Sequence, residues 1–222
     1  MKKLAALCLS MVVCMALLTG TALADKYKPG TYKGSAKGYS TPQHAGRIEV
    51  EVTVDANAIK DIKLVAFEQT DKGAQAEFVA QAKDKIPAEI VGKQSLNVES
   101  VAKASASSMG IELAVAQCLE QATVAYKDGT YKGKAVGYQN PSHPGEIEVE
   151  VTIAGGKISN IAVPTFHQTE QGKQGELSAE AKNKIPGEIV AKQSVAVDSV
   201  AKASMSSDGI KLAVARALEQ AR

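Results

Sequence analysis

The sequence has 222 residues, enough for one large domain or two small ones. It contains no tryptophan, 4% aromatic residues and 45% hydrophobic residues, which excludes a disordered tail, a collagen-like fibre and a disulfide-stapled miniprotein. The formal net charge is +2, and without Lys2 and Lys3 the chain is neutral. There is therefore no basic surplus that would indicate nucleic acid as a partner.

Residues 1–24 have the pattern of a secretory signal peptide. A basic start is followed by an apolar run over residues 4–18, and Ala22 and Ala24 occupy the positions of an A-x-A cleavage site. We therefore expect an extracytoplasmic protein, periplasmic or secreted, whose mature chain starts at Asp25. The alternative is an uncleaved membrane anchor, because the apolar run approaches the length that spans a bilayer.

The cysteine content is consistent with export. Cys8 and Cys14 lie in the expected signal peptide, so only Cys118 remains in the mature chain. A single cysteine forms no intramolecular disulfide, and it supplies neither a C-x-x-C-H haem site nor a cysteine-ligated iron–sulfur cluster. Cys118 falls on an apolar helical face and is expected to be a small core residue.

The rest of the chain is a duplication. Residues 26–123 align with residues 125–222 at a constant shift of 99 positions without a gap, and more than half of the aligned pairs are identical. This is a tandem repeat of one unit, not a solenoid of short repeats. We expect two domains with these boundaries, each of viable size.

The first half of each unit has the alternation of β-strands with one buried face. Apolar residues occupy every second position over 48–54 and again over 147–153. Gly155-Gly156 then predicts a tight hairpin turn with positive φ, and Asn57 is expected to serve the same purpose in the first copy. A third strand is expected over 59–67 and 158–166, and a shorter first strand over the Gly-Thr-Tyr-Lys-Gly segments.

The second half of each unit is helical. A helix is expected over Ala74–Lys85, and Pro87 is expected to begin a second, short helix at its first position. The final helix has one apolar face, made of Ile111, Ala114, Val115, Cys118, Leu119 and Ala122. Strands followed by helices predict an α+β fold: two tandem copies of a small antiparallel sheet with helices packed on it.

Serines gather where the final helix begins. They are Ser105, Ser107 and Ser108 in the first copy and Ser204, Ser206 and Ser207 in the second. One interpretation is helix capping, since serine hydroxyls accept bonds from the free N–H groups of a first turn. The other is phosphate binding, because three hydroxyls exceed what a cap needs and a lysine, Lys103 or Lys202, precedes them.

The ordered series of motifs resembles the covalent FMN-binding domain family. Residues 128–133 match its opening (D/K)-G-x-Y-x-G, and residues 86–95 match L/I-P-x-x-I-V-x-x-Q-S. The segment that opens the final helix is similar to D-x-V-S-G-A-(S/T)-x-(S/T)-S-x-x-I, whose second hydroxyl residue carries the flavin. The resemblance covers nearly the whole mature chain, twice, and implies FMN as the cofactor.

Carried over residue by residue, the resemblance implies a phosphoester between FMN and Ser107, Ser206 or both. The residues expected at the cofactor are Lys103, Ala104, Ser105, Ser107 and Ser108 in the first copy, and Lys202, Ala203, Ser204, Ser206 and Ser207 in the second. Lys103 and Lys202 stand where the family has glycine, so they either lose a glycine backbone angle or contact the FMN phosphate. Gln69-Thr70 and Gln168-Thr169 stand where the family often has E-T-P-G.

The three histidines do not indicate a metal site. His44 and His143 lie in matching loops, whereas His167 has no counterpart in the first copy. We expect solvated histidines or contacts to the flavin edge, because no H-E-x-x-H motif or cysteine pair accompanies them. There is also no nucleophile elbow, P-loop or G-x-G-x-x-G fingerprint.

The resemblance, together with the expected signal peptide, implies an exported electron-transfer protein that carries up to two flavins. We expect a carrier more than an enzyme, because no acid–base pair accompanies the flavin positions. The expected partners are a flavin transferase and a membrane or extracytoplasmic reductase. The alternative is a binding or regulatory module that keeps the fold without flavin. Asp128 and Asp198 follow the family pattern more closely than Pro29 and Glu99, so Ser206 is expected to be the better loaded serine.

Overall fold

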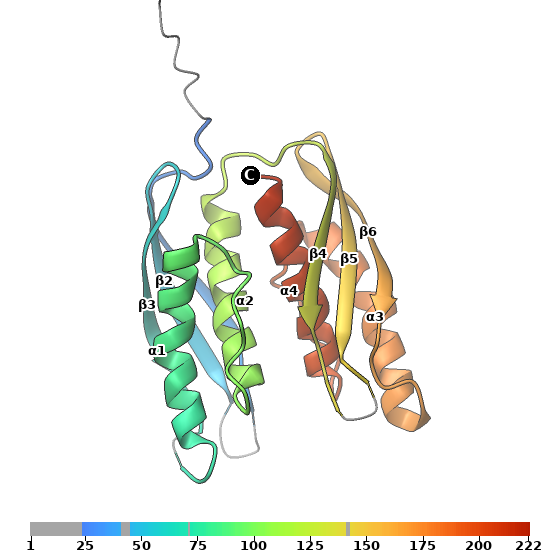
Figure 1. Cartoon of the computed structure of the whole chain (residues 1–222). Coiled ribbons are helices and arrows are strands. Elements are labelled where there is room, and N and C mark those ends of the chain that lie inside the picture. The colour runs from blue at the N-terminus through green and yellow to red at the C-terminus, as the bar shows by residue number, and fades with distance from the viewer. Residues whose placement is uncertain (1–23, 41–44, 71, 141–142) are drawn as a thin grey trace, which may run out of the picture.

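The computed structural model describes residues 24–40, 45–70, 72–140 and 143–222 (Figure 1). The predicted signal peptide, apart from Ala24, and His44 lie outside the described residues. The elements of the first unit are β1 (Gly30–Lys37), β2 (Arg47–Val54), β3 (Ile59–Phe67), α1 (Ala76–Lys93) and α2 (Ser105–Ala122). Those of the second unit are β4 (Gly129–Val136), β5 (Glu146–Ala154), β6 (Lys157–Phe166), α3 (Gly172–Lys192) and α4 (Ser204–Gln220).

Each unit is a three-stranded antiparallel sheet with its two helices on one face, which confirms the predicted α+β fold. The alternation in β2 buries Ile48, Val50, Val52 and Val54, whose side chains have at most 3% of their surface exposed. The opposite face carries charged cross-strand pairs, such as Lys33 with Glu51 at 3.1 Å. The period of two therefore decides which face receives the helices.

The hairpin turns differ between the copies. Gly155 and Gly156 have φ of +60° and +71°, as predicted, and their N–H groups donate to the Asp128 carboxylate at 3.0 and 2.8 Å. The prediction for Asn57 is wrong, because this residue does not take a positive φ. Instead the Asp55 carboxylate accepts the N–H groups of Asn57 and Ala58, at 2.9 and 2.7 Å, and holds a different turn.

The prediction of a helix break at Pro87 is also wrong. One helix, α1, runs from Ala76 to Lys93 with Pro87 inside it, and α3 contains Pro186 in the same way. Proline removes one backbone hydrogen bond, but Ile86 and Ile90, one turn apart, are fully buried on the same side of α1. Packing on the sheet thus keeps both halves of the helix aligned.

Helices α2 and α4 lie side by side at the centre of the molecule (Figure 1). All six residues of the apolar face predicted for α2 are buried, but so are Leu113 and Ala116 on its other side. These additional residues are covered because α2 packs against its own sheet and also against α4. A helix with two packing partners loses the exposed face that an amphipathic pattern would predict.

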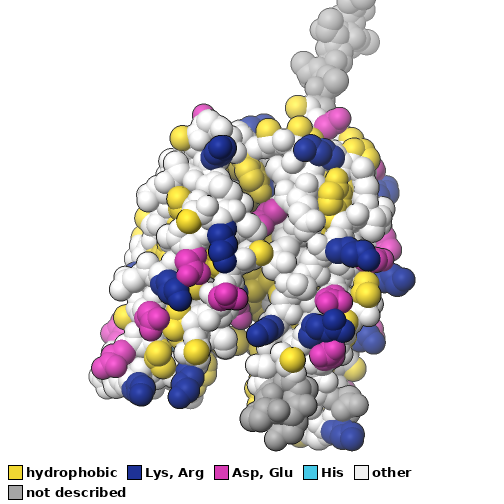
Figure 2. Space-filling view, turned by 180° about the vertical axis from the view of Figure 1, so that it is seen from behind, with side chains coloured by type: hydrophobic (Ala, Val, Ile, Leu, Met, Phe, Trp, Pro, Cys, Tyr) yellow, Lys and Arg dark blue, Asp and Glu magenta, His cyan; other side chains and the backbone are white. Residues whose placement is uncertain are grey.

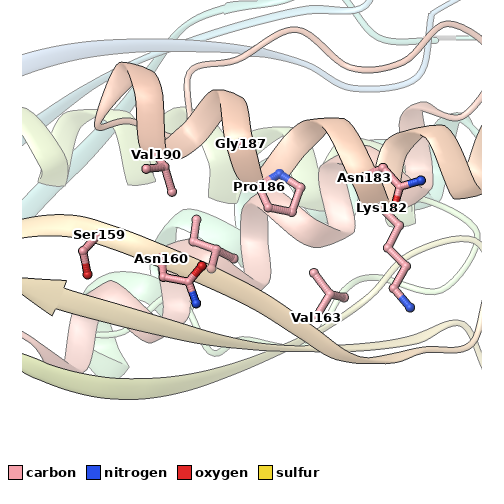
Figure 3. A pocket seen from close by; sticks show the side chains of 9 residues that line it. Ser159, Asn160, Val163, Lys182, Asn183, Pro186, Gly187 and Val190 are labelled. Carbon is pink, nitrogen blue, oxygen red and sulfur yellow. The ribbon is translucent and has the colours of Figure 1, made fainter.

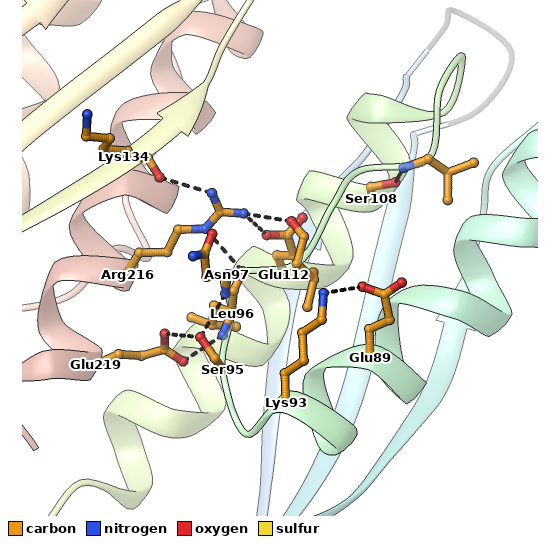
Figure 4. Close-up of polar contacts among 12 residues, drawn as sticks. Glu89, Lys93, Ser95, Leu96, Asn97, Ser108, Glu112, Lys134, Arg216 and Glu219 are labelled. Carbon is orange, nitrogen blue, oxygen red and sulfur yellow. Dashed lines mark hydrogen bonds and ion pairs between the residues drawn. The ribbon is translucent and has the colours of Figure 1, made fainter.

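A reciprocal exchange of hydrogen bonds joins the two units. The Glu219 carboxylate accepts the Leu96 N–H at 2.7 Å and the Ser95 hydroxyl at 3.0 Å, as Figure 4 shows. At the equivalent positions, the Glu120 carboxylate accepts the N–H of Val195 at 3.0 Å and the hydroxyl of Ser194 at 2.7 Å. The duplicated sequence therefore forms a nearly two-fold symmetric interface with itself.

One buried ion pair breaks this symmetry. Arg216 of α4 donates to the Glu112 carboxylate of α2 at 2.7 Å, and also to the Leu96, Val98 and Lys134 carbonyls (Figure 4). Burial raises the pKa of Glu112 to about 7, although the Arg216 charge lowers it. The residue equivalent to Glu112 in α4 is Lys211, which pairs with Asp208 instead at 2.6 Å. The ion pair therefore forms at only one of the two equivalent positions of the interface between the units.

Glu112 makes the stability of the protein depend on pH. A folded-state pKa of about 7, above the ordinary 4.5, means that the folded chain binds this proton more tightly than the unfolded chain. The contribution of Glu112 to the free energy of unfolding should therefore fall as pH rises from 4.5 to about 7, by up to ~1.4 kcal/mol per pH unit. Urea denaturation at a series of pH values should show a flatter profile for Glu112→Gln than for the wild type. An unchanged slope would contradict this assignment.

Candidate functional site

The serine-bearing segments form the first turns of α2 and α4, and both helices begin at the same end of the molecule (Figure 1). Two glycines allow this placement. A Cβ on Gly110 would come within 3.0 Å of the Gly38 backbone, and one on Gly209 within 2.9 Å of Gly137. Each helix therefore packs directly, near its start, on the first residue after β1 or β4.

The serines do not cap their helices, so the capping interpretation is wrong. The residues at the N-cap positions are Ala104 and Ala203, neither helix has a side-chain cap, and neither first turn contains an acidic residue. The first helical bond runs from the Ser108 N–H to the Ala104 carbonyl. The N–H groups of residues 105–107, which precede it, keep the partial positive charge of the helix start available to an anion.

Ser108 and Ser207 have a local structural task. The Ser108 hydroxyl accepts the Val101 N–H at 3.1 Å and donates to the Ala104 carbonyl at 3.0 Å. Ser207 makes the same two bonds with Val200 and Ala203. These buried hydroxyls tie the preceding loop to the helix, and they are engaged with backbone groups rather than free to meet a phosphate.

Ser107 and Ser206 are buried, with 1% and 2% of their surface exposed. The Ser107 hydroxyl lies 2.8 Å from the Gln69 side-chain oxygen, and Ser206 lies 2.8 Å from that of Gln168. Sequence reasoning had not assigned these glutamines to the site. The sequence did contain one indication of their role: both copies have Gln-Thr at the position where the family often has Glu-Thr.

Each glutamine uses its whole amide group. Gln69 Oε1 also accepts the Tyr39 N–H at 2.9 Å, and its Nε2 donates to the Gly46 and Glu68 carbonyls at 2.8 and 3.0 Å. Gln168 makes the equivalent bonds with Tyr138, Gly145 and His167. Ser107 and Ser206 are thus connected, through these glutamines, to both flanks of the loop that follows the first strand of their unit.

Lys103 and Lys202 have a backbone angle that glycine adopts more readily than other residues. Their φ values are +67° and +64°, in the left-handed region. Both side chains are exposed, and the Lys103 ammonium lies 4.5 Å from the centre of the Phe78 ring. The lysines therefore keep the turn before the helix and place a positive charge near its start.

Relieving this backbone strain should stabilise the protein. Lys202→Gly should raise the free energy of unfolding by about 1 kcal/mol, because glycine adopts positive φ without steric cost. Lys103→Gly should gain less, since it also loses the Phe78 contact. Urea denaturation would measure both changes, with Lys182→Gly, in the middle of α3, as a control expected to destabilise. A loss of stability in Lys202→Gly would refute the strain.

The described histidines are engaged with ordinary polar partners. His143 Nε2 lies 2.9 Å from the Asn140 amide and 3.3 Å from the Thr169 hydroxyl, and His167 lies 3.5 Å from Glu146. Within the residues that the structure describes, no group of three or more His, Cys, Asp or Glu side chains is arranged to hold a metal ion. His143 lies near the site, because its partner Thr169 directly follows Gln168 in the chain.

Cys118 lies in the core, as predicted, and burial raises the pKa of its thiol to about 12. Its thiol donates to the Tyr32 carbonyl at 3.4 Å. In the described part of the chain, no helix combines the length and apolar character needed to span a bilayer.

Two cavities in the described part of the chain lie away from Ser107 and Ser206. One of about 460 Å³ lies between β6 and α3, beside Asn160, Pro186 and Lys182 (Figure 3). Another of about 610 Å³ lies between the units, beside Asn97, Lys134 and Arg216. Figure 2 shows two lobes with acidic and basic side chains interspersed on this face. None of these features has a charge pattern that singles out a ligand.

The helix starts are therefore the best-built candidate site. They combine uncapped N–H groups, a hydroxyl at the third helical residue, the absence of acidic residues in the first turn and an adjacent lysine. This donor set suits a phosphate group.

Comparison with known proteins agrees with this chemistry. The family model described as the FMN-binding domain matches residues 43–120 and again residues 143–219. A crystal structure of the CPE2226 protein from Clostridium perfringens is similar at 20% identity and a TM-score of 0.36, covering 43% of this chain and 88% of that one. The family matches cover most of the chain, one in each unit, so the protein belongs to the FMN-binding domain family and carries that domain twice.

Proposed function

We propose that this protein is an exported electron carrier in which FMN is esterified to Ser107 and Ser206. The observation that carries the proposal is the uncapped start of α2 and α4, where each of these serines lies. Bound FMN would supply the redox chemistry, and the protein would supply attachment and surroundings.

The chain's own residues would hold the phosphate through backbone groups. The N–H groups of residues 105–107 and 204–206 point out of the helix start and favour negative charge. Lys103 and Lys202 are exposed beside these groups and would add a positive charge. Ala104 and Ala203 occupy the N-cap positions and are buried, so their side chains add no competing polar group at the helix starts.

Attachment requires a second protein. A flavin transferase would present FMN joined through a pyrophosphate to a leaving group. Ser107 or Ser206 would supply the oxygen of the new P–O bond, the pyrophosphate P–O bond would break, and the serine proton would leave with the departing phosphate. No group is oxidised or reduced. A membrane or extracytoplasmic reductase is the proposed redox partner, reached after cleavage near Ala24.

A second candidate function is a binding or regulatory module without flavin. The burial of Ser107 and Ser206 and their bonds to glutamine favour it, because neither hydroxyl is exposed to an attaching enzyme. The two functions differ in a property that can be measured directly.

Intact-mass spectrometry of the protein from its native host distinguishes them. Each attached flavin adds the mass of FMN less one water, so two additions are expected, together with a yellow colour that survives denaturation. A colourless protein at the bare chain mass would support the module without flavin. The same spectrum would show whether residues 1–24 have been removed.

A further inference from the structure

The glutamines bound to the acceptor serines suggest how attachment is controlled. We propose that Gln69 and Gln168 are positioning residues that hold the Ser107 and Ser206 hydroxyls inside the protein and release them before the ester forms. This inference rests on the proposed function, and it concerns the unmodified chain.

The geometry is the same in both copies. Each serine hydroxyl donates to a glutamine oxygen at 2.8 Å, and each of these oxygens also accepts a backbone N–H, from Tyr39 or Tyr138, at 2.9 Å. With at most 2% of its surface exposed, the serine cannot meet a transferase in this arrangement.

The ester is incompatible with the same arrangement. Esterification removes the hydroxyl proton, so the serine oxygen can only accept, and it would then face the glutamine oxygen, which also only accepts. Turning the amide over does not help. It would direct the glutamine oxygen at the Gly46 and Glu68 carbonyls and its NH₂ group at the Tyr39 N–H. Three existing hydrogen bonds would be lost for one gained.

The hydrogen bond between serine and glutamine therefore favours the unmodified chain, and esterification of the serine breaks it. Loading should speed up when the glutamine is removed, because a typical net hydrogen bond corresponds to about a fivefold change in an equilibrium.

Access to the serine can be tested without flavin. Ser107→Cys places a thiol at position 107, and the rate at which it is alkylated reports the exposure of that position. Cys118→Ala is added to remove the buried native thiol, because alanine occupies the equivalent position of the second unit. Adding Gln69→Ala should raise this rate about 5- to 10-fold. The matched control is Gln94→Ala, which removes a similar amide that binds the Ile59 N–H and carbonyl elsewhere in the same unit. An equal rise in the control, or no rise with Gln69→Ala, would overturn the proposal.

Loading itself is the second measurement. In a Ser206→Ala chain co-expressed with a flavin transferase, flavin per chain is followed over time by intact mass. Gln69→Ala should load about 5-fold faster than its parent, while Gln94→Ala should not. Slower loading of folded Gln69→Ala would overturn the proposal. If neither parent nor variant loads, the proposed function fails, whereas the alkylation rates still decide whether Gln69 controls access to position 107.

Discussion

Replacing Ser107 and Ser206 together by alanine should remove all covalently bound flavin from the protein. Each serine supplies the single oxygen through which the phosphoester would form, and alanine offers no nucleophile in its place. The measurement is intact mass of the protein from a host that contains the transferase. Each single variant should lose one flavin mass, with Ser206 the more fully loaded site of the two.

The variants should remain folded, so loss of flavin would not reflect loss of structure. Ser107→Ala removes one hydrogen bond, worth about 1 kcal/mol, and Gln69 keeps its Tyr39 N–H partner. Ser105→Ala is the matched control, because it removes a hydroxyl from the same turn and should leave the flavin in place. Flavin retained at full level in the double variant would exclude the ester at both serines, and flavin on Ser107 alone would reverse the ranking.

Gly133→Ala should destabilise the second unit severely, by about 3 kcal/mol or more. The added Cβ would lie 1.9 Å from the Ala213 carbonyl oxygen and 2.8 Å from the Ala217 nitrogen, both backbone atoms of α4. Because neither atom can rotate away, β4 must separate from the helix, and overpacking of this kind is costly. The separation would also strain the bond from Gln220 to the Lys132 carbonyl, which measures 2.6 Å.

Urea denaturation followed by circular dichroism would measure this loss. Gly187→Ala serves as the control, since a Cβ there meets open space within α3 and should stabilise by about 0.5–1 kcal/mol. Gly34→Ala, at the equivalent position of the first unit, should behave like Gly133→Ala because its Cβ would lie 2.1 Å from the Ala114 oxygen. A Gly133→Ala protein as stable as the wild type would mean that β4 and α4 are less closely packed than described.

Several features of the fold could be predicted because they depend on neighbouring residues. The alternation over β2 and β5 placed their buried faces correctly, and the glycine pair at 155–156 formed the predicted turn. The prediction at Pro87 was wrong because the cost of a proline inside a helix is local, whereas the packing that outweighs it is not. The serines lie at the start of the final helix, as the sequence indicated, but capping was wrongly considered for them because the N-cap position falls on Ala104.

The amino-acid sequence by itself determined the duplication, the order of strands and helices, and the serines at the start of α2 and α4. Only the tertiary structure decided that Ser107 is buried against Gln69, 38 positions away, and that Glu112 pairs with Arg216, 104 positions away. The physical reason is that periodicity specifies which face of an element is buried but not which residue it meets. Those partners are chosen when α2 packs on its sheet and then against α4.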